Sequence, residues 1–310
     1  MRKYTFPSKI LLFGEYGIIE NHMGLLIPNN LYKGHLKFNH KYKSINFYNY
    51  SNNEIKKYFN FLKKKKLKLN LVKLEKDLKK GIFFKSNIPQ GYGIGSSGAL
   101  TAAIYDRYSE NKLVINKKNL ISLKFIFSEM ESFFHGKSSG IDPLICYLKK
   151  PIIIRSNNNI SILNKKNIYL KKFFQINGTI FLIDSGFPSK TISVNNFFIE
   201  KLKQKNFKKI MKDEFAKYNE KCINFFLKKN FNDSKILLEN IKKISIWIFN
   251  HFQPMIPKNL LKIWIEGIIN NDYYLKLCGS GGGGYVLGFT QKYENFNKKL
   301  KKYVKKIIYV

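Results

Sequence analysis

Cysteine is scarce in this sequence, with only three residues among 310. They are Cys146, Cys222 and Cys278, which lie far apart and form no CxxC pair. An odd number of widely spaced cysteines does not suit the disulfide framework by which small secreted domains are held together. The cysteine content instead indicates a reducing compartment, and we expect a cytoplasmic protein.

Long apolar runs are also absent. Arg2 and Lys3 precede the apolar run 10–13, but that run is too short for the hydrophobic region of a secretory signal. No uninterrupted apolar stretch elsewhere is long enough to span a bilayer. The sequence therefore predicts neither a signal peptide nor a membrane-spanning helix, and we expect no membrane partner.

Acidic residues and arginine are also scarce in this sequence. The chain has 20 Asp and Glu residues against 56 Lys and Arg residues, which gives a formal net charge of +36. So high a positive charge normally indicates a protein that binds nucleic acid. Arginine, however, occurs only at positions 2, 107 and 155, and nucleic-acid readers generally use arginine for bidentate and stacked contacts. The excess of Lys, Asn, Ile, Phe and Tyr is typical of an AT-rich genome. We therefore expect no nucleic-acid partner; a polyanion-binding face is the alternative.

The length suits two domains or one large one, and a hydrophobic content of 44% is ample for a core. Residues 4–50, including the aromatic stretch 36–50, read as strands broken by turns, and 81–87 reads as a further strand. From an apolar strand at 178–184 onward, the composition shifts to long lysine-rich helices at 193–250. We therefore place the boundary between residues 1–174 and 175–310.

A glycine-rich segment, Pro89 to Ser109, is the strongest functional signal. Glycine occupies positions 91, 93, 95 and 98, serine occupies 96 and 97, and a segment without helix breakers follows. A glycine turn that leads into a helix presents free backbone N–H groups and the positive end of the helix dipole, which together bind anions, most often phosphate. Ser96 and Ser97 are helix-cap residues, and one hydroxyl could also reach a metal ion.

Other interpretations of this segment are weaker. Glycines 93, 95 and 98 satisfy the dinucleotide fingerprint, but that motif should open a first βαβ unit, whereas some ninety residues come before this one. The Walker loop requires a lysine that is absent here. A turn that merely caps a helix is the remaining structural alternative.

Two acidic residues follow. The spacing predicts a helix from Asn119 to Phe134, ended by His135-Gly136, with apolar residues around most of its circumference. Glu131 therefore stands on a buried element, where a carboxylate needs a partner or a metal. Asp142 is followed by Pro143, and Asp at the N-cap with Pro at the first helical position is a common helix start. A structural role as a helix cap is therefore an alternative for Asp142.

Three separated segments resemble the motifs of the GHMP small-molecule kinases. They are Lys9 to Gly14, Pro89 to Ala99, and Leu277 to Gly284, the last a glycine loop between two strands. Within the family, the segment from Glu131 to Asp142 is most similar to the mevalonate kinase pattern E-x-x-x-H-G-x-x-S-G-[VI]-D. Departures from that group are Tyr16 in place of a usual histidine and Gly98 in place of a usual alanine.

The resemblance implies an α+β fold in two parts. The N-terminal domain would be similar to the second domain of ribosomal protein S5, and the C-terminal domain would be ferredoxin-like. The implied activity is ATP-dependent phosphorylation of mevalonate in isoprenoid precursor synthesis, with ATP and Mg²⁺ as cofactors; it is compatible with a homodimer. The alternatives are a kinase of the same family for phosphomevalonate or a sugar, and a non-catalytic polyanion-binding relative.

The resemblance also implies roles for single residues. Asp142 matches the catalytic base, and Lys9 matches a lysine that contacts the nucleotide and steadies the charged site. Ser97 and Glu131 match the magnesium ligands, and Thr191 matches a threonine near the substrate. The triphosphate would be wrapped by Gly91, Tyr92, Gly93, Ile94, Gly95, Ser96 and Ser97. His135 has no firm family role: we interpret it as a residue that terminates its helix, and a substrate contact is the alternative.

Overall fold

The computed structural model describes residues 4–38, 45–156, 158–164, 168–175, 177–189, 191–228, 234–296 and 298–307. The chain forms two compact units, each assembled from separate segments. Unit 1 contains Met1–Lys9, Pro28–Pro89 and Gly95–Lys149, and unit 2 contains Ile10–Ile27, Gln90–Ile94 and Lys150–Val310. Within the glycine-rich segment, Gln90–Ile94 therefore belongs to unit 2, and Gly95 onward belongs to unit 1. The predicted boundary near residue 175 stays a prediction.

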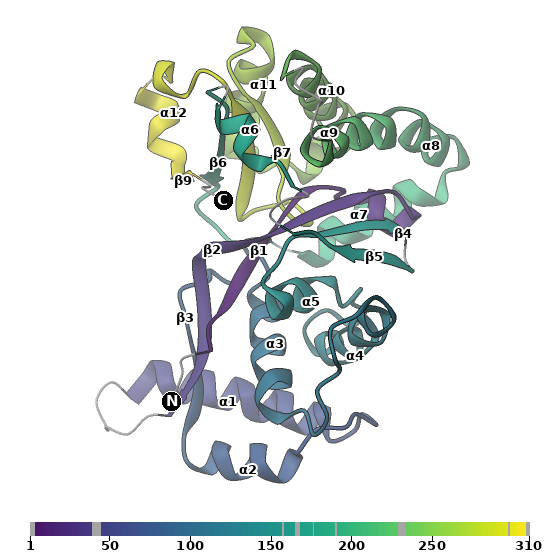
Figure 1. Cartoon of the computed structure of the whole chain (residues 1–310). Helices are drawn as coiled ribbons and strands as arrows, with labels where there is room; N and C mark the ends of the chain where they lie inside the picture. Colours follow the sequence, from purple (N-terminus) through teal and green to yellow (C-terminus); the bar gives the residue numbers. More distant parts are fainter. Residues whose placement is uncertain are drawn as a thin grey trace. The chain divides into compact units, whose positions relative to one another are not determined.

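Unit 1 is built mainly of helices packed beside the ends of strands. Its elements are the start of β1 (Phe6–Phe13), the end of β2 (Gly24–Phe38), α1 (Ile45–Leu62), α2 (Leu71–Lys79), β3 (Ile82–Ser86), α3 (Ser96–Tyr108), α4 (Lys117–His135) and α5 (Ile141–Leu148). β3 pairs antiparallel with β2, from Gly34 opposite Ser86 to Phe38 opposite Ile82. Helix α3 packs on both α4 and α5, and α1 packs on β3 and α2 (Figure 1).

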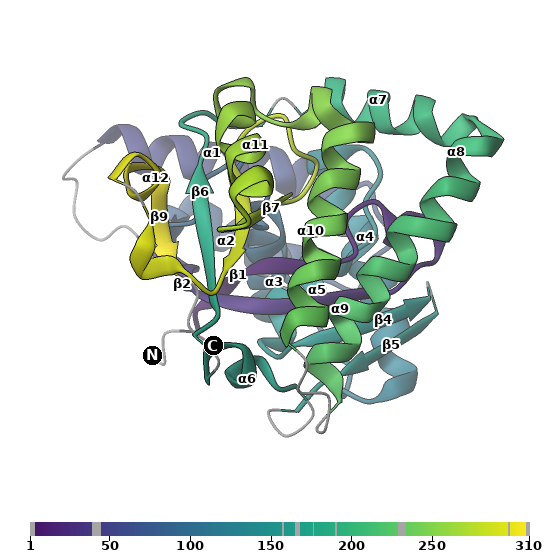
Figure 2. The same cartoon turned by 90° about the horizontal axis from the view of Figure 1, so that it is seen from above.

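Unit 2 holds an antiparallel sheet covered by helices. The strand order is β7 (Tyr274–Leu277), β8 (Tyr285–Thr290), β6 (Thr179–Asp184) and β9 (Val304–Ile307). The helices are α6 (Leu170–Gln175), α7 (Thr191–Lys203), α8 (Lys205–Ile210), α9 (Lys217–Leu227), α10 (Ser234–Phe252), α11 (Leu261–Asn270) and α12 (Lys298–Tyr303). Helices α10 and α11 pack against β7, and α9 lies beside α10 (Figure 2).

A second set of strands in unit 2 comes before this sheet in the chain. The beginning of β2 pairs with β4 (Ile152–Ser156), and β4 pairs with β5 (Asn159–Ile162), both antiparallel. A short 3-10 helix at Gly17–Glu20 follows β1. Within the described residues, no helix is long and apolar enough to cross a membrane. The mixture of helix and sheet confirms the predicted α+β class.

The strand prediction for residues 36–50 holds as far as Phe38, where β2 ends, and is wrong from Ile45 onward. Residues 39–44 lie outside the described residues, and helix α1 begins at Ile45. Ile55, Tyr58, Phe59 and Leu62 recur at a spacing of three or four and are all buried. That helical period determines the local structure, because burial of one helix face contributes more than the preference of aromatic residues for strands.

Candidate active site

The glycine turn places the first turn of α3 at the candidate site. Gly95 is the N-cap in the left-handed region, at φ 80°, and helix α3 begins at Ser96. Ser96 and Ser97 therefore lie within the first turn rather than capping the helix, and no side chain caps it. The Ser97 hydroxyl is therefore available for contacts away from its own backbone.

Ser97 contacts a buried carboxylate on α4. Its Oγ donates to Oε1 of Glu131 at 3.0 Å, and Ser138 Oγ donates to Oε2 at 2.5 Å. Glu131 is 3% exposed. Burial, followed by the nearby charge of Asp142, raises the pKa of Glu131 to about 8, although both hydroxyls and Lys9 oppose that rise. The site therefore holds a carboxylate whose charged form would be stabilised by a cation.

Asp142 pairs with Lys9, which comes from β1. Lys9 Nζ lies 3.2 Å from Oδ2 of Asp142, and the lysine side chain is 6% exposed while the aspartate is 32% exposed. The N-cap of α5 is Gly140, so Asp142 is not the predicted cap but the second residue of the helix. Its carboxylate is thus oriented by the lysine and remains partly open to solvent.

His135 joins this cluster, although the sequence suggested mainly a helix-terminating role for it. It is the last residue of α4, and Gly136, at φ 71°, does end the helix after it. Its Nε2 lies 3.1 Å from Ser97 Oγ. Burial lowers the pKa of His135, which favours the neutral ring. Glu131 and His135 are four residues apart, so they share one helix face, and this spacing could have revealed the contact.

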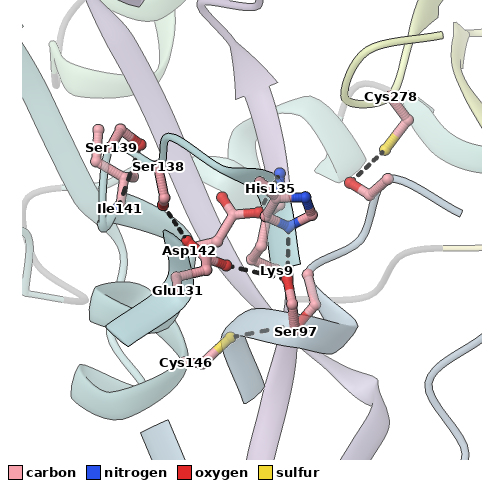
Figure 3. A network of polar contacts seen from close by, with 12 residues as sticks. Lys9, Ser97, Glu131, His135, Ser138, Ser139, Ile141, Asp142, Cys146 and Cys278 are labelled. Atoms are coloured by element: carbon pink, nitrogen blue, oxygen red, sulfur yellow. Dashed lines mark hydrogen bonds and ion pairs between the residues drawn. The ribbon is translucent and has the colours of Figure 1, made fainter. Parts of the chain in front are cut away.

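Figure 3 shows how these side chains converge from different elements of unit 1. Lys9 comes from β1, Ser97 from α3, Glu131 and His135 from α4, and Asp142 from α5. The structure therefore brings together the predicted base, lysine and pair of magnesium ligands. Thr191 is the first residue of α7 in unit 2, and its side chain lies outside the described residues.

The donor set fits a magnesium ion. Mg²⁺ is held in proteins by one or two carboxylates and keeps several waters and substrate phosphate oxygens. Ser97 and Glu131 supply adjacent oxygen donors, and two nearby carboxylates, Glu131 and Asp142, face one lysine. Among the described residues, no group of three or more His, Cys, Asp or Glu side chains could hold a metal ion. A magnesium site that is completed by phosphate oxygens does not require such a group.

The first half of the glycine-rich segment is fixed in unit 2 by its backbone. Gly91 O accepts from Ser189 N at 2.8 Å, Tyr92 O from Tyr285 N at 3.3 Å, and Gly93 O from Cys278 Sγ at 3.8 Å. A Cβ on Gly93 would lie 2.1 Å from the Cys278 carbonyl oxygen. Glycine is required there, because a loop held backbone to backbone has no room for a side chain.

The packing around Gly98 explains why this chain has glycine where mevalonate kinases usually have alanine. A Cβ at this position would lie 2.8 Å from the Asp142 carbonyl carbon and 2.9 Å from Pro143 N, so α3 and α5 pack too closely for alanine. We predict that Gly98→Ala destabilises the fold by about 1–3 kcal/mol, as overpacking does, and displaces Asp142. Thermal unfolding and turnover measure the two effects. Unchanged values for both would show that the helices can separate without cost.

Comparisons with known proteins agree with this geometry. Residues 53–150 match the GHMP kinases N terminal domain. Mevalonate kinase from Methanococcus jannaschii has a TM-score of 0.62 and 20% identity, with 98% of this chain and 96% of that chain covered. The L. major mevalonate kinase, solved with R-mevalonate, has a TM-score of 0.65 and 16% identity, with 99% and 94% covered. A Streptococcus pneumoniae phosphomevalonate kinase, in complex with phosphomevalonate and AMPPNP, has a TM-score of 0.59 and 12% identity, with 97% and 94% covered.

No curated protein sequence matches this chain. At identities of 12–20%, the structural likeness establishes the fold, and it does so over nearly the whole chain. The matched domain contains α3, α4 and α5, and with them Ser97, Glu131 and Asp142. Residues 53–150 therefore belong to the GHMP kinase N-terminal domain family, and the chain has the GHMP kinase fold.

Proposed function

We propose that this chain is an ATP-dependent kinase that phosphorylates mevalonate at its primary hydroxyl, in isoprenoid precursor synthesis. The observation that supports it most is the pairing of Lys9 with Asp142 beside the Ser97–Glu131 contact at the start of α3. Phosphoryl transfer asks a protein mainly to position the reactants and neutralise charge. A lysine, a base and two metal donors around a helix N-terminus supply both.

Asp142 is the proposed general base. Its partly exposed carboxylate can accept the proton of the attacking hydroxyl, and the 3.2 Å pairing with Lys9 holds it in one orientation. Lys9 is the proposed cation beside the phosphates, where it offsets the negative charge that accumulates around Asp142 and Glu131.

The phosphates of ATP are the proposed ligands of the glycine-rich segment. Residues Gly91 to Ser97 present backbone N–H groups, and the start of α3 adds the positive end of a helix dipole. Ser97 and Glu131 would hold Mg²⁺, with His135 fixing the Ser97 hydroxyl at 3.1 Å. When bound, the ion neutralises charge on the phosphate oxygens. Thr191 is proposed to contact the alcohol substrate.

The motifs lack the additional cationic groups that phosphomevalonate would require, and we therefore favour mevalonate as the substrate. One lysine suffices for the carboxylate of mevalonate. Phosphomevalonate carries a dianionic phosphate in addition, and such a group usually recruits arginine or several donors. None of the motifs contains arginine, since Arg occurs only at positions 2, 107 and 155. Galactose and homoserine offer different polar groups, and we expect them to be inert.

The proposal is tested by competition between the alcohols at fixed Mg·ATP. We predict that kcat/KM for mevalonate exceeds that for phosphomevalonate at least tenfold, roughly 1.4 kcal/mol of transition-state discrimination. A coupled ADP assay with each alcohol alone gives the two constants. A preference for phosphomevalonate would keep the kinase assignment and reject the substrate, while no turnover of any alcohol would favour the non-catalytic, polyanion-binding alternative.

A further inference from the structure

The turn between α4 and α5 contains a serine, Ser138, to which the proposed function gives no role. It lies between Glu131 and Asp142, at a position that the mevalonate kinase pattern leaves open to any residue. Ser138 is partly buried, and its side chain points toward Glu131 (Figure 3). The motif does not require serine there, so its contacts must be explained from this structure.

The Ser138 hydroxyl makes two hydrogen bonds, one as a donor and one as an acceptor. It donates to Glu131 Oε2 at 2.5 Å and accepts the backbone N–H of Gly140 at 3.0 Å. A serine hydroxyl has one proton and two lone pairs, and an amide N–H can only donate, so the proton remains for the carboxylate. The bond from Gly140 therefore orients the hydroxyl as a donor toward Glu131.

The backbone around Ser138 is anchored to α4 by other contacts. Ser128 Oγ donates to the carbonyl oxygen of Ser138 at 2.5 Å. A Cβ on Gly140 would lie 2.1 Å from the carbonyl oxygen of Lys124, so the turn packs directly against the helix backbone. The packing of the turn thus places Ser138 independently of its bond to Glu131.

The two carboxylate oxygens of Glu131 are held by different hydroxyls. Oε1 accepts from Ser97 at 3.0 Å, and Oε2 accepts from Ser138. Glu131 is 3% exposed, so water has little access to replace either bond. With Oε2 engaged by the turn, Oε1 is the oxygen that faces Ser97 and the proposed magnesium site. Hydrogen bonds to a metal-binding carboxylate commonly orient it in this way.

We propose that Ser138 is a positioning residue for the magnesium site, which holds Oε2 of Glu131 so that Oε1 stays beside Ser97. The inference rests on the proposed function for the identity of the ion, whereas the orientation of Glu131 belongs to the metal-free protein. Loss of the Ser138 hydroxyl would leave a buried carboxylate with one donor fewer and free to rotate. The ion would then bind more weakly, because binding would have to order its own ligand.

The test compares Ser138→Ala with Ser138→Thr and with a matched control. Threonine retains the hydroxyl, whereas alanine removes it. Ser132→Ala is the control, because Ser132 also lies on α4 but its hydroxyl donates to a backbone carbonyl, that of Glu129, at 2.8 Å.

Two measurements do not depend on turnover. Mn²⁺ replaces Mg²⁺ and AMPPNP replaces ATP, and electron paramagnetic resonance counts the free Mn²⁺ in a titration of each variant. A crystal structure of the metal-free Ser138→Ala protein then gives the orientation of the Glu131 carboxylate.

We expect Ser138→Ala to weaken Mn²⁺ binding about tenfold or more, the usual effect of removing a residue that orients a metal ligand. Ser138→Thr should stay within about threefold of wild type, and Ser132→Ala within about twofold. The Mg²⁺ concentration for half-maximal rate should rise by the same factor as the Mn²⁺ dissociation constant. The kcat at saturating Mg²⁺ should change less, because Lys9 still pairs with Asp142.

Three results would overturn the proposal: wild-type Mn²⁺ affinity in Ser138→Ala, an unmoved Glu131 carboxylate in its crystal structure, or an equal loss in Ser132→Ala. A loss that threonine does not restore would also overturn it, because the packing of the turn rather than the hydroxyl would then be responsible. If wild-type protein binds no Mn²⁺ with AMPPNP, but Glu131 turns in Ser138→Ala, the proposed function fails while the effect of Ser138 on Glu131 stands.

Discussion

Replacing Asp142 by asparagine is expected to lower kcat by about 10²–10⁴, the usual contribution of a general base and equivalent to about 2.7–5.4 kcal/mol in the barrier. Asparagine preserves the volume of the side chain and an oxygen for Lys9, but it cannot take up the hydroxyl proton. The KM for ATP should barely move, because the proposed phosphate contacts are made by the glycine-rich segment and Lys9. Steady-state kinetics with mevalonate and Mg·ATP measures both constants.

A second carboxylate in unit 1 provides the control. Asp106 on α3 pairs with Lys112 at 2.7 Å, at the surface, so Asp106→Asn removes one charge without touching the cluster. We expect that variant to keep nearly all of its activity, as most surface substitutions do. If Asp142→Asn folds normally and its kcat is within about threefold of the wild-type value, then Asp142 has only a structural role in the first turn of α5.

Much of the site could be predicted because its residues lie in short local motifs. Lys9, Ser97, Glu131 and Asp142 were each expected near a phosphate loop, and the structure places them together in unit 1. What sequence reasoning missed depends on contacts between distant segments. The Tyr16 hydroxyl reaches carbonyls more than 260 residues away, and no local pattern encodes such a pairing.

The errors of the sequence analysis have a common physical origin. Ser97 and Asp142 both appeared to be helix caps, because serine and Asp-Pro commonly begin helices. In the structure glycines with positive φ, Gly95 and Gly140, take the cap positions, which leaves both side chains for the site. Fold prediction failed in the same way at Ile45, where aromatic residues suggested strands but tertiary burial selected a helix.

Removing either proposed magnesium ligand is expected to raise the Mg²⁺ concentration for half-maximal rate at least tenfold. Even residues that only orient a metal ligand are worth about 10–100-fold in affinity, so a direct ligand should cost no less. Ser97→Ala deletes one oxygen donor, and Glu131→Gln keeps the size of the side chain while removing its charge. Initial rates over a Mg²⁺ titration at saturating ATP and mevalonate measure the shift.

The double variant separates a shared ion from two independent effects. Ser97 and Glu131 contact each other at 3.0 Å, so the combined loss should be clearly smaller than the product of the single losses. Ser96→Ala is the matched control, because Ser96 lies in the same turn of α3 but has no side-chain hydrogen bond to Glu131. Strictly multiplicative losses would mean that the two residues do not serve one ion. Greater sensitivity at Ser96 would move the proposed metal contact to that serine.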